Sequence, residues 1–453
     1  MKTLAELARD LEAGTVTSRQ LVEECLTRIT DPRGEGPRTF LKVHAEPARA
    51  AADYHDRLRA QGVTLSPWAG IPISIKDLFD MAGDVTTAGS RALQGRPPAS
   101  ADCAAVARLR AAGFIPIGRT NMTEFAYSGL GLNPHYGTPR NPFERQRGRA
   151  PGGSSSGAAI SITEEMSYGA IGTDTGGSCR IPAAFCGTVG FKPTARRVPV
   201  SGVFPLSQSL DSVGPLAASV GCCATLDAVL AGEPTETLAV MELRRRRFAI
   251  PTRHVLESLE AHVARSFERA IGEVRGAGAE VSEIPLAELD ELHAINRKGG
   301  FSGAEAYAAH RERLESQIES YDPRVSLRIL RGREQSAADY LDLIRARSDL
   351  QRRIDPQLVE FDAVLLPTTP IIAPLLKDLE SDEAYMRTNQ LALRNTAVAN
   401  FLDRCAISIP CQEQGAAPVG LMLMGAHGAD RRLLGLAAAV EALVSPRLAR
   451  QGR

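Results

Sequence analysis

An alternation of two kinds of segment limits the fold of this chain more than any other feature of its sequence. Short apolar segments of strand length are separated by segments with helical periodicity. Ile71, Ile73 and Ile75 alternate with other residues as in a strand, residues 102–113 then fit a helix, and residues 114–118 form a second apolar segment. Similar strand-like segments recur at residues 167–172, 248–251, 361–367, 406–410 and 419–424. Strands that alternate with helices are typical of α/β proteins with a wound sheet. We therefore expect an α/β fold.

Two parts of the chain depart from this alternation. Residues 1–62 form an N-terminal helical part, in which Thr17 and Gln20 have the spacing of a helix-capping box. Residues from about 223 to 350 are charge-dense and mostly helical. Because strand-like segments stand on both sides of this stretch, we expect a single domain over residues 1–453, with the stretch as an embedded helical layer.

The charge balance and the apolar segments exclude several classes of protein. The chain has 53 basic and 53 acidic residues, so it has no overall positive field to hold a nucleic-acid backbone. The longest apolar stretch, residues 433–444, is too short to span a membrane, and the N-terminus lacks the apolar region of a secretory signal. None of the 8 cysteines forms a CxxC pair. We expect a cytoplasmic protein with reduced cysteines and without a nucleic-acid or membrane partner.

No motif predicts a metal or a nucleotide cofactor. The 8 histidines are scattered, and the chain lacks an HExxH sequence. The glycine-rich turn at residues 172–178 lacks the lysine of a phosphate-binding P-loop, and no GxGxxG follows a strand. We therefore expect no metal and no cofactor.

Two turns rich in glycine and serine carry the candidate chemistry. The first is GGSSSG at residues 152–157, and the second is DTGGSCRIP at residues 174–182. In the second, a strand leads into a glycine turn and then Ser178, and Pro182 suits the first turn of a helix. Backbone N–H groups in such a turn can stabilise an oxyanion while the adjacent serine attacks a carbonyl carbon. The alternative is a tight turn in which serine only caps a helix.

A serine nucleophile needs a base, and the sequence offers two kinds. The GxSxG elbow of α/β-hydrolases matches residues 153–157, with His427 as the base. That elbow should follow a buried strand, whereas the polar residues 147–151 precede this one. The other base is Lys76, at the end of the alternating strand, in a chain with 47 Arg and only 6 Lys. A desolvated lysine can become neutral and arginine cannot, although Lys76 could also simply extend its ammonium group to solvent.

Lys76, the GGSSSG turn and the DTGGSCRIP turn together resemble the amidase signature family of serine hydrolases. Ser154 and Ser178 are 24 residues apart, as in the serine pair of that family. Residues 120–125, 133–139, 190–194 and 399–401 also resemble the family, so the similarity covers nearly the whole chain. It implies a large mixed, twisted central sheet covered by helices on both faces.

The resemblance also implies a role for each motif residue. Ser178 would be the nucleophile, Ser154 would relay protons between Ser178 and Lys76, and neutral Lys76 would be the base. The Gly153–Ser154 peptide bond would be cis. The N–H groups of four residues would form the oxyanion hole: Thr175, Gly176, Gly177 and Ser178. Three further residues would support these groups without touching the substrate: Ser155, Asp174 and Arg180.

The substrate is the least determined feature. We expect an amidase that hydrolyses a small aliphatic or aromatic carboxamide to a carboxylate and ammonia through an acyl-Ser178 intermediate. One alternative is the A subunit, a glutaminase, of the tRNA-dependent amidotransferase, which would need partner subunits. Another is a non-catalytic binding protein on the same scaffold, against which the intact motif argues. The resemblance also favours a homodimer. Candidate pocket residues, each of which could instead pack in the core, are Tyr127, Phe301, Tyr307 and Tyr321.

Overall fold

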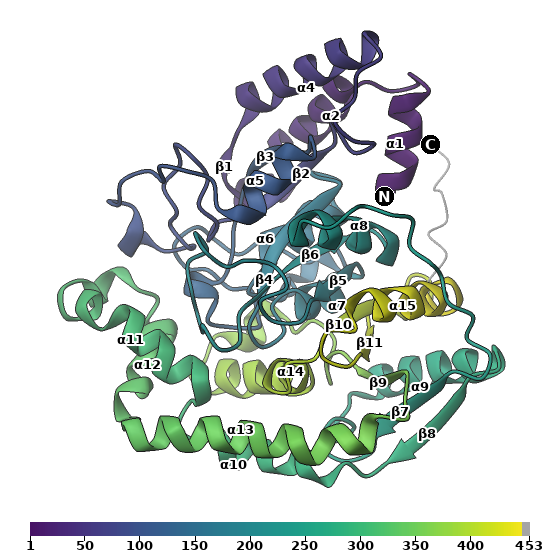
Figure 1. The fold of residues 1–453 in the computed structure, drawn as a ribbon. Coiled ribbons are helices and arrows are strands. Elements are labelled where there is room, and N and C mark those ends of the chain that lie inside the picture. Colours follow the sequence, from purple (N-terminus) through teal and green to yellow (C-terminus); the bar gives the residue numbers. More distant parts are fainter. Residues whose placement is uncertain (446–453) are drawn as a thin grey trace.

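The computed structural model describes residues 1–445, and its centre is an eleven-stranded mixed sheet (Figure 1). In spatial order the strands are β1 (Phe40–Val43), β3 (Ile115–Thr120), β2 (Pro72–Lys76), β4 (Gly169–Asp174), β6 (Ser212–Ala217), β5 (Val189–Lys192), β10 (Ala406–Pro410), β11 (Gly420–Met424), β9 (Ala363–Pro367), β7 (Arg247–Pro251) and β8 (Glu280–Ile284). Strand β2 is parallel to β3 and β4, and β7 is parallel to β8 and β9. The other pairs are antiparallel, so the predicted mixed sheet is confirmed.

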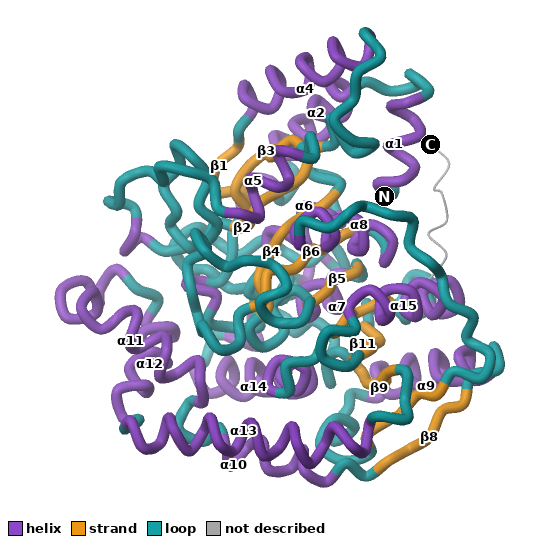
Figure 2. Tube along the Cα trace, in the orientation of Figure 1, coloured by secondary structure: helices purple, strands orange, loops and turns teal. Residues whose placement is uncertain are grey.

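Helices surround this sheet, as Figure 2 shows by element type. They are α1 (Leu4–Glu12), α2 (Ser18–Thr30), α3 (Gly36–Thr39), α4 (Ala45–Ala60), α5 (Ala104–Ala111), α6 (Ser156–Thr163), α7 (Arg180–Cys186), α8 (Val220–Ala231), α9 (Ala261–Gly276), α10 (Glu291–Ile295), α11 (Gly300–Gln317), α12 (Pro323–Leu330), α13 (Ala337–Leu358), α14 (Asp382–Phe401) and α15 (Asp430–Val444).

The helices cover both faces of the sheet, as predicted. Helix α6 packs on α7 and α7 on α14, whereas α8 packs on α5 and α15, and α15 also packs on α9. On β4, Ala170 belongs to the apolar cluster of α6 and α7, and its neighbour Ile171 belongs to the larger cluster that includes α8. Successive strand residues point to opposite faces, so these two helix groups lie on opposite sides.

Each predicted strand has a counterpart, but four strands were not predicted. Strand β5 has only four residues and contains glycine, and the six-residue strand β6 contains both glycine and proline, which weaken a strand pattern. Strand β8 lies at the edge of the sheet and is largely polar, and β1 has only four residues at the opposite edge. Both β7 and β8 come from the 223–350 stretch, which therefore contributes strands to the sheet as well as helices.

The N-terminal part begins with two capped helices. Thr17 Oγ1 accepts a hydrogen bond from Gln20 N–H at 3.1 Å, and Gln20 Oε1 accepts one from Thr17 N–H at 2.8 Å. This is the predicted capping box, and it starts α2. Within residues 1–445, no helix is both long enough and apolar enough to cross a membrane.

The sheet topology brings the motif residues together. Lys76 is the last residue of β2, and Asp174 is the last residue of β4, which lies next to β2 and runs parallel to it. The carboxyl ends of parallel strands meet at one edge of a sheet, where α/β proteins commonly bind ligands. The turn that carries Ser178 leaves β4 at this edge, and Ser155 immediately precedes α6, which packs on both strands.

Candidate active site

Lys76 is fully buried and faces hydroxyl groups instead of solvent. Its Nζ donates hydrogen bonds to Ser154 Oγ at 2.7 Å and to Thr173 Oγ1 at 3.0 Å. Burial lowers the pKa of Lys76 from 10.5 to about 8, and the charges of Asp174 and Asp211 oppose this shift only in part. The alternative of an ammonium group that extends to solvent is therefore wrong. A lysine with this pKa has an appreciable neutral fraction near neutral pH.

The first glycine–serine turn fixes Ser154 beside Lys76. The Gly153–Ser154 peptide bond is cis, as the resemblance implies. Ser154 C=O accepts a hydrogen bond from Thr123 N–H at 3.1 Å, and Ser155 N–H donates to Ser178 C=O at 3.3 Å. The Ser155 hydroxyl donates to Thr173 C=O at 3.4 Å. These backbone contacts hold the two serine-bearing turns against each other.

Ser178 lies in the turn between β4 and α7 and lines a cleft. Within residues 1–445, the N–H groups of Thr175, Gly176 and Ser178 have no hydrogen-bond partner, and neither has Ser178 Oγ. Gly177 N–H instead donates to Asp174 Oδ1 at 2.8 Å, so the expectation that it serves an oxyanion is not met in this structure. Gly177 has φ 137°, and a Cβ there would overlap the Thr396 side chain, which explains the glycine.

Asp174 and Arg180 form a fully buried ion pair at 2.8 Å behind the nucleophile turn. Asp174 also accepts a hydrogen bond from Cys179 N–H at 3.0 Å, and Arg180 donates to Asn400 Oδ1 at 2.7 Å. Burial by itself would raise the pKa of Asp174, but the Arg180 charge and the hydrogen bonds that Asp174 accepts from Arg180, Asn400 and Cys179 outweigh it and lower the pKa to about 2. Neither side chain lines the cleft, so the pair braces the turn from behind.

Sequence reasoning did not assign a role to several residues that hold the nucleophile turn. Thr396 Oγ1 donates to Gly176 C=O at 2.6 Å, and Asn400 Nδ2 donates to Asp174 C=O at 3.0 Å, both from α14. Thr175 Oγ1 donates to Asp211, whose pKa burial raises to about 6. These partners are 36 to 226 residues away along the chain, so no local spacing could reveal them.

The cleft has a volume of about 740 Å³, and two of the four predicted pocket residues line it, Tyr127 and Phe301. The other two predictions are wrong. Tyr321 packs against Phe125 with ring centroids 5.1 Å apart, and its hydroxyl lies 3.0 Å from His310 Nδ1. Tyr307 is half-buried against the main apolar cluster. Tyr321 is therefore a core residue and Tyr307 packs partly buried against the core, which is the alternative that the sequence left open.

The hydrolase-elbow alternative is also wrong. His427 is exposed, and its Nδ1 lies 2.9 Å from Asp403 C=O. It does not line the cleft that contains Ser178. Ser155, the elbow serine, is fully buried and precedes α6 without following a strand.

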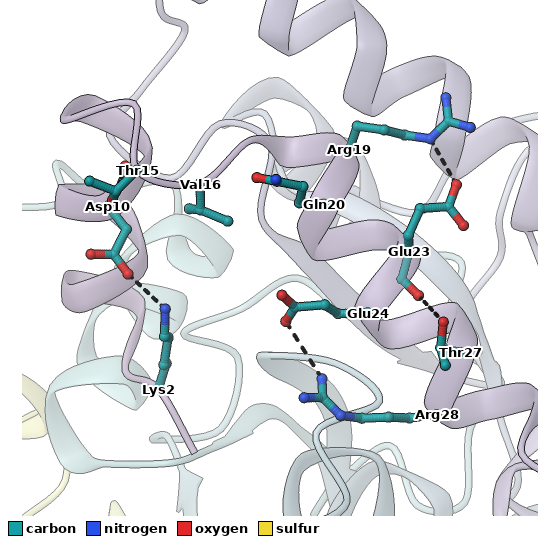
Figure 3. A pocket seen from close by; sticks show the side chains of 10 residues that line it. All are labelled: Lys2, Asp10, Thr15, Val16, Arg19, Gln20, Glu23, Glu24, Thr27 and Arg28. Atoms are coloured by element: carbon teal, nitrogen blue, oxygen red, sulfur yellow. Dashed lines mark hydrogen bonds and ion pairs between the residues drawn. The ribbon is translucent and has the colours of Figure 1, made fainter. Parts of the chain in front are cut away.

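A second hollow of about 1,040 Å³ lies over α1 and α2, and Figure 3 shows its lining. Its charged side chains pair with each other: Lys2 with Asp10 at 2.8 Å, and Arg19 with Glu23 at 2.8 Å. None of the motif residues lines it. Among residues 1–445, no three His, Cys, Asp or Glu side chains are grouped as metal ligands. The cleft at Ser178 is therefore the candidate active site.

Comparison with known proteins agrees with this geometry. A model of the amidase family, described as "Amidase", matches residues 20–434. The chain belongs to the amidase family. It is therefore a hydrolase that acts on C–N bonds.

Individual relatives of this chain have different activities. It is 36% identical to a 2-amino-5-chloromuconic acid deaminase of Comamonas testosteroni, over 98% of this chain and 96% of the relative. It is 34% identical to the A subunit of the glutamyl-tRNA(Gln) amidotransferase of Chloroflexus aggregans, over 92% of this chain and 91% of the relative. A solved structure described as an amidase superposes with a TM-score of 0.89 at 32% identity, over 98% of this chain and all of the other. These comparisons establish the family and the fold but leave the substrate open.

Proposed function

We propose that this amidase hydrolyses a small carboxamide to a carboxylate and ammonia through an acyl-Ser178 intermediate. The observation that carries the proposal is the 2.7 Å hydrogen bond between buried Lys76 and Ser154, at the edge of the sheet where Ser178 lines the cleft. A serine becomes a nucleophile only when a base removes its proton. Lys76 is suited to this because burial lowers its pKa to about 8, which leaves a neutral fraction near neutral pH.

In the proposed reaction, Ser178 Oγ attacks the amide carbon while its proton passes to Ser154 Oγ, and the Ser154 proton passes to neutral Lys76 Nζ. The oxygen of the tetrahedral intermediate accepts hydrogen bonds from the free N–H groups of Thr175, Gly176 and Ser178. Collapse of the intermediate breaks the C–N bond, and the proton returns from Lys76 through Ser154 to the departing nitrogen. Water then hydrolyses the acyl-Ser178 ester along the same proton path.

The roles of Lys76 and Ser154 are supported by their burial and their hydrogen bond, and the role of Ser178 by its place in the cleft at the same sheet edge. The relatives support C–N hydrolysis more broadly, since one acts as a deaminase and others are amidotransferase subunits. The cleft volume of about 740 Å³ is that of a small-molecule site.

The test is ammonia release by the purified protein alone. The panel contains aliphatic and aromatic carboxamides and L-glutamine, and Ser178→Ala is the blank. We expect turnover of at least one amide that is not an amino acid, and loss of at least a thousandfold in the variant. Equal ammonia release by wild type and Ser178→Ala would overturn the proposal.

The second candidate is the glutaminase subunit of an amidotransferase, which the 34% identity to such a protein favours. In that case ammonia would come from L-glutamine only, or would appear only after partner subunits are added. The same panel therefore separates the two functions.

A further inference from the structure

The cleft at Ser178 is strongly cationic. Its lining includes five arginines and two histidines and no aspartate or glutamate. We refer to the five arginines as the cleft arginines: Arg297, Arg328, Arg331, Arg387 and Arg394. A concave surface of one charge attracts ligands of the opposite charge and raises their local concentration.

The cleft arginines differ from their neighbours because none of them is neutralised. Within residues 1–445, none forms an ion pair with a carboxylate within 4.0 Å, whereas nearby arginines outside the cleft do. Arg324 pairs with Asp382 at 2.8 Å, and Arg353 pairs with Glu291 at 2.7 Å. Arginines without an ion pair also occur elsewhere among residues 1–445, such as exposed Arg57 and Arg265, but in the cleft five of them line one cavity whose lining contains no carboxylate.

Two cleft arginines are half-buried and have no carboxylate partner among residues 1–445. Arg328 lies with its guanidinium 4.4 Å from the centre of the Tyr127 ring and donates to Tyr127 C=O. Arg394 donates only to neutral groups, to Asn395 Oδ1 at 3.1 Å and Val255 C=O at 3.3 Å. Burial lowers the Arg394 pKa more than the nearby charge of Glu257 raises it. A bound carboxylate would offset the cost of burying such a cation.

Helix α14 connects these arginines to the proposed catalytic turn. Thr396 and Asn400 of α14 hold the backbone of the nucleophile turn. Arg394 lies two residues before Thr396, and Arg387 lies seven residues earlier on the same face, about 10 Å further along the helix axis. Apolar side chains also line the cleft: Leu206, Leu210, Leu292, Phe301 and Leu393. A ligand in the cleft would thus meet the nucleophile, apolar side chains and arginines.

We propose that the cleft arginines bind a carboxylate on the acyl portion of the substrate, so that the substrate is an amide that also carries a carboxylate. This inference rests on the proposed amide hydrolysis and narrows its substrate class. Arginine suits this task because its planar guanidinium can bind both carboxylate oxygens at once. Binding energy from such a remote group also holds the amide in register with Ser178.

The test uses matched pairs of amides. Succinamate, glutaramate, adipamate and terephthalamate are compared with neutral isosteres in which an isopropyl group replaces the carboxylate, and ammonia is measured. We expect the anionic member of the best pair to have at least a tenfold higher kcat/KM, with the advantage shrinking as salt is added. Equal kcat/KM values within every pair would overturn the carboxylate site.

Arginine variants locate the site. Arg387→Gln and Arg394→Gln should each raise KM for the anionic amide at least tenfold and leave the neutral isostere within twofold. Arg353→Gln removes the same charge from a paired arginine outside the cleft. It should not change KM for either substrate. An equal loss on anionic and neutral amides would contradict the proposal and indicate a structural role.

Failure of this inference can be separated from failure of the proposed function. If the neutral isosteres release ammonia in a Ser178-dependent way and the anionic amides do not, amide hydrolysis stands and the carboxylate site is wrong. If no amide is hydrolysed, calorimetric titration of glutarate into Ser178→Ala tests directly whether the cleft arginines bind a carboxylate. Millimolar or tighter binding that Arg394→Gln abolishes supports it, and the absence of binding contradicts it.

Discussion

Lys76 and Lys192 are both fully buried at the end of a strand in the same sheet, yet their surroundings differ. Burial lowers the pKa of each from 10.5 to about 8, and both feel the charge of Asp174. Lys76 Nζ contacts two hydroxyl groups, of Ser154 and Thr173, beside the cleft. Lys192 Nζ donates to the backbone carbonyl of Pro193 at 2.7 Å and does not line the cleft.

The difference between these lysines separates two requirements for a lysine base. Desolvation makes a neutral amine available, and both lysines meet that condition. A base also needs a group from which it can take a proton, and a backbone carbonyl has none to give. Of the two, Lys76 alone is next to a hydroxyl that can relay a proton, so we propose a catalytic role for Lys76 and a structural role for Lys192.

The largest expected difference is in turnover. Lys76→Met should lower kcat/KM by at least a thousandfold, because it removes the proposed base, and Lys192→Met should stay within about threefold of wild type. Ammonia release by both purified variants is the measurement, and thermal unfolding verifies that each is folded. Similar losses in the two variants would remove the distinction between the lysines.

The pH dependence of turnover sharpens the comparison. If Lys76 must be neutral, kcat/KM should fall about tenfold per pH unit below an apparent pKa near 8, because protonation removes the base. Lys192→Met should leave this profile unchanged. A profile that stays flat between pH 6 and 8 in the wild type would argue against a lysine base.

Lys192 should affect the free energy of unfolding above pH 8, whereas the expected loss of kcat/KM occurs below pH 8. Its folded-state pKa of about 8 lies below the ordinary 10.5, so the unfolded chain binds more protons between these two pH values. The free energy of unfolding therefore rises with pH in this window, by about 3 kcal/mol for one such lysine. Denaturant unfolding at pH 8 and pH 10 should show a smaller rise in Lys192→Met than in wild type. An identical rise would mean that Lys192 titrates normally.

The smallest expected effect concerns Thr173. Its hydroxyl accepts a hydrogen bond from Lys76 and thereby favours the charged amine. Thr173→Val, which keeps the shape of the side chain, should lower the apparent pKa of kcat/KM by a few tenths to one unit while most of kcat remains. An upward shift would contradict this role of Thr173.

Much of the candidate site was predictable because its motifs are local in sequence. Lys76, Ser154 and Ser178 stand out through the scarcity of lysine and the two glycine–serine turns. Contacts over long chain distances, such as Thr396 with Gly176, leave no local pattern. Tyr321 was assigned to the pocket because an aromatic residue in a helical segment has the same pattern in a core and in a cleft.

The fold was predictable to the extent that its strands are continuous and apolar. Strand β6 was missed because Gly214 and Pro215 interrupt it, although every residue in it is buried. The cationic cleft could not be predicted from the sequence, because arginines on helices normally indicate a solvent-exposed face. Only the three-dimensional arrangement reveals that Arg387 and Arg394 lack the carboxylate partner that Arg324 has.

The most direct test of the central claim, that Lys76 activates Ser178 through Ser154, is labelling with a fluorophosphonate followed by peptide mass mapping. A serine oxygen attacks phosphorus, fluoride leaves, and the adduct marks the activated serine. We predict one adduct, on Ser178, which forms at the wild-type rate in Lys192→Met and at least a hundredfold more slowly in Lys76→Met. An adduct on another residue, or equal rates in the two lysine variants, would contradict this claim.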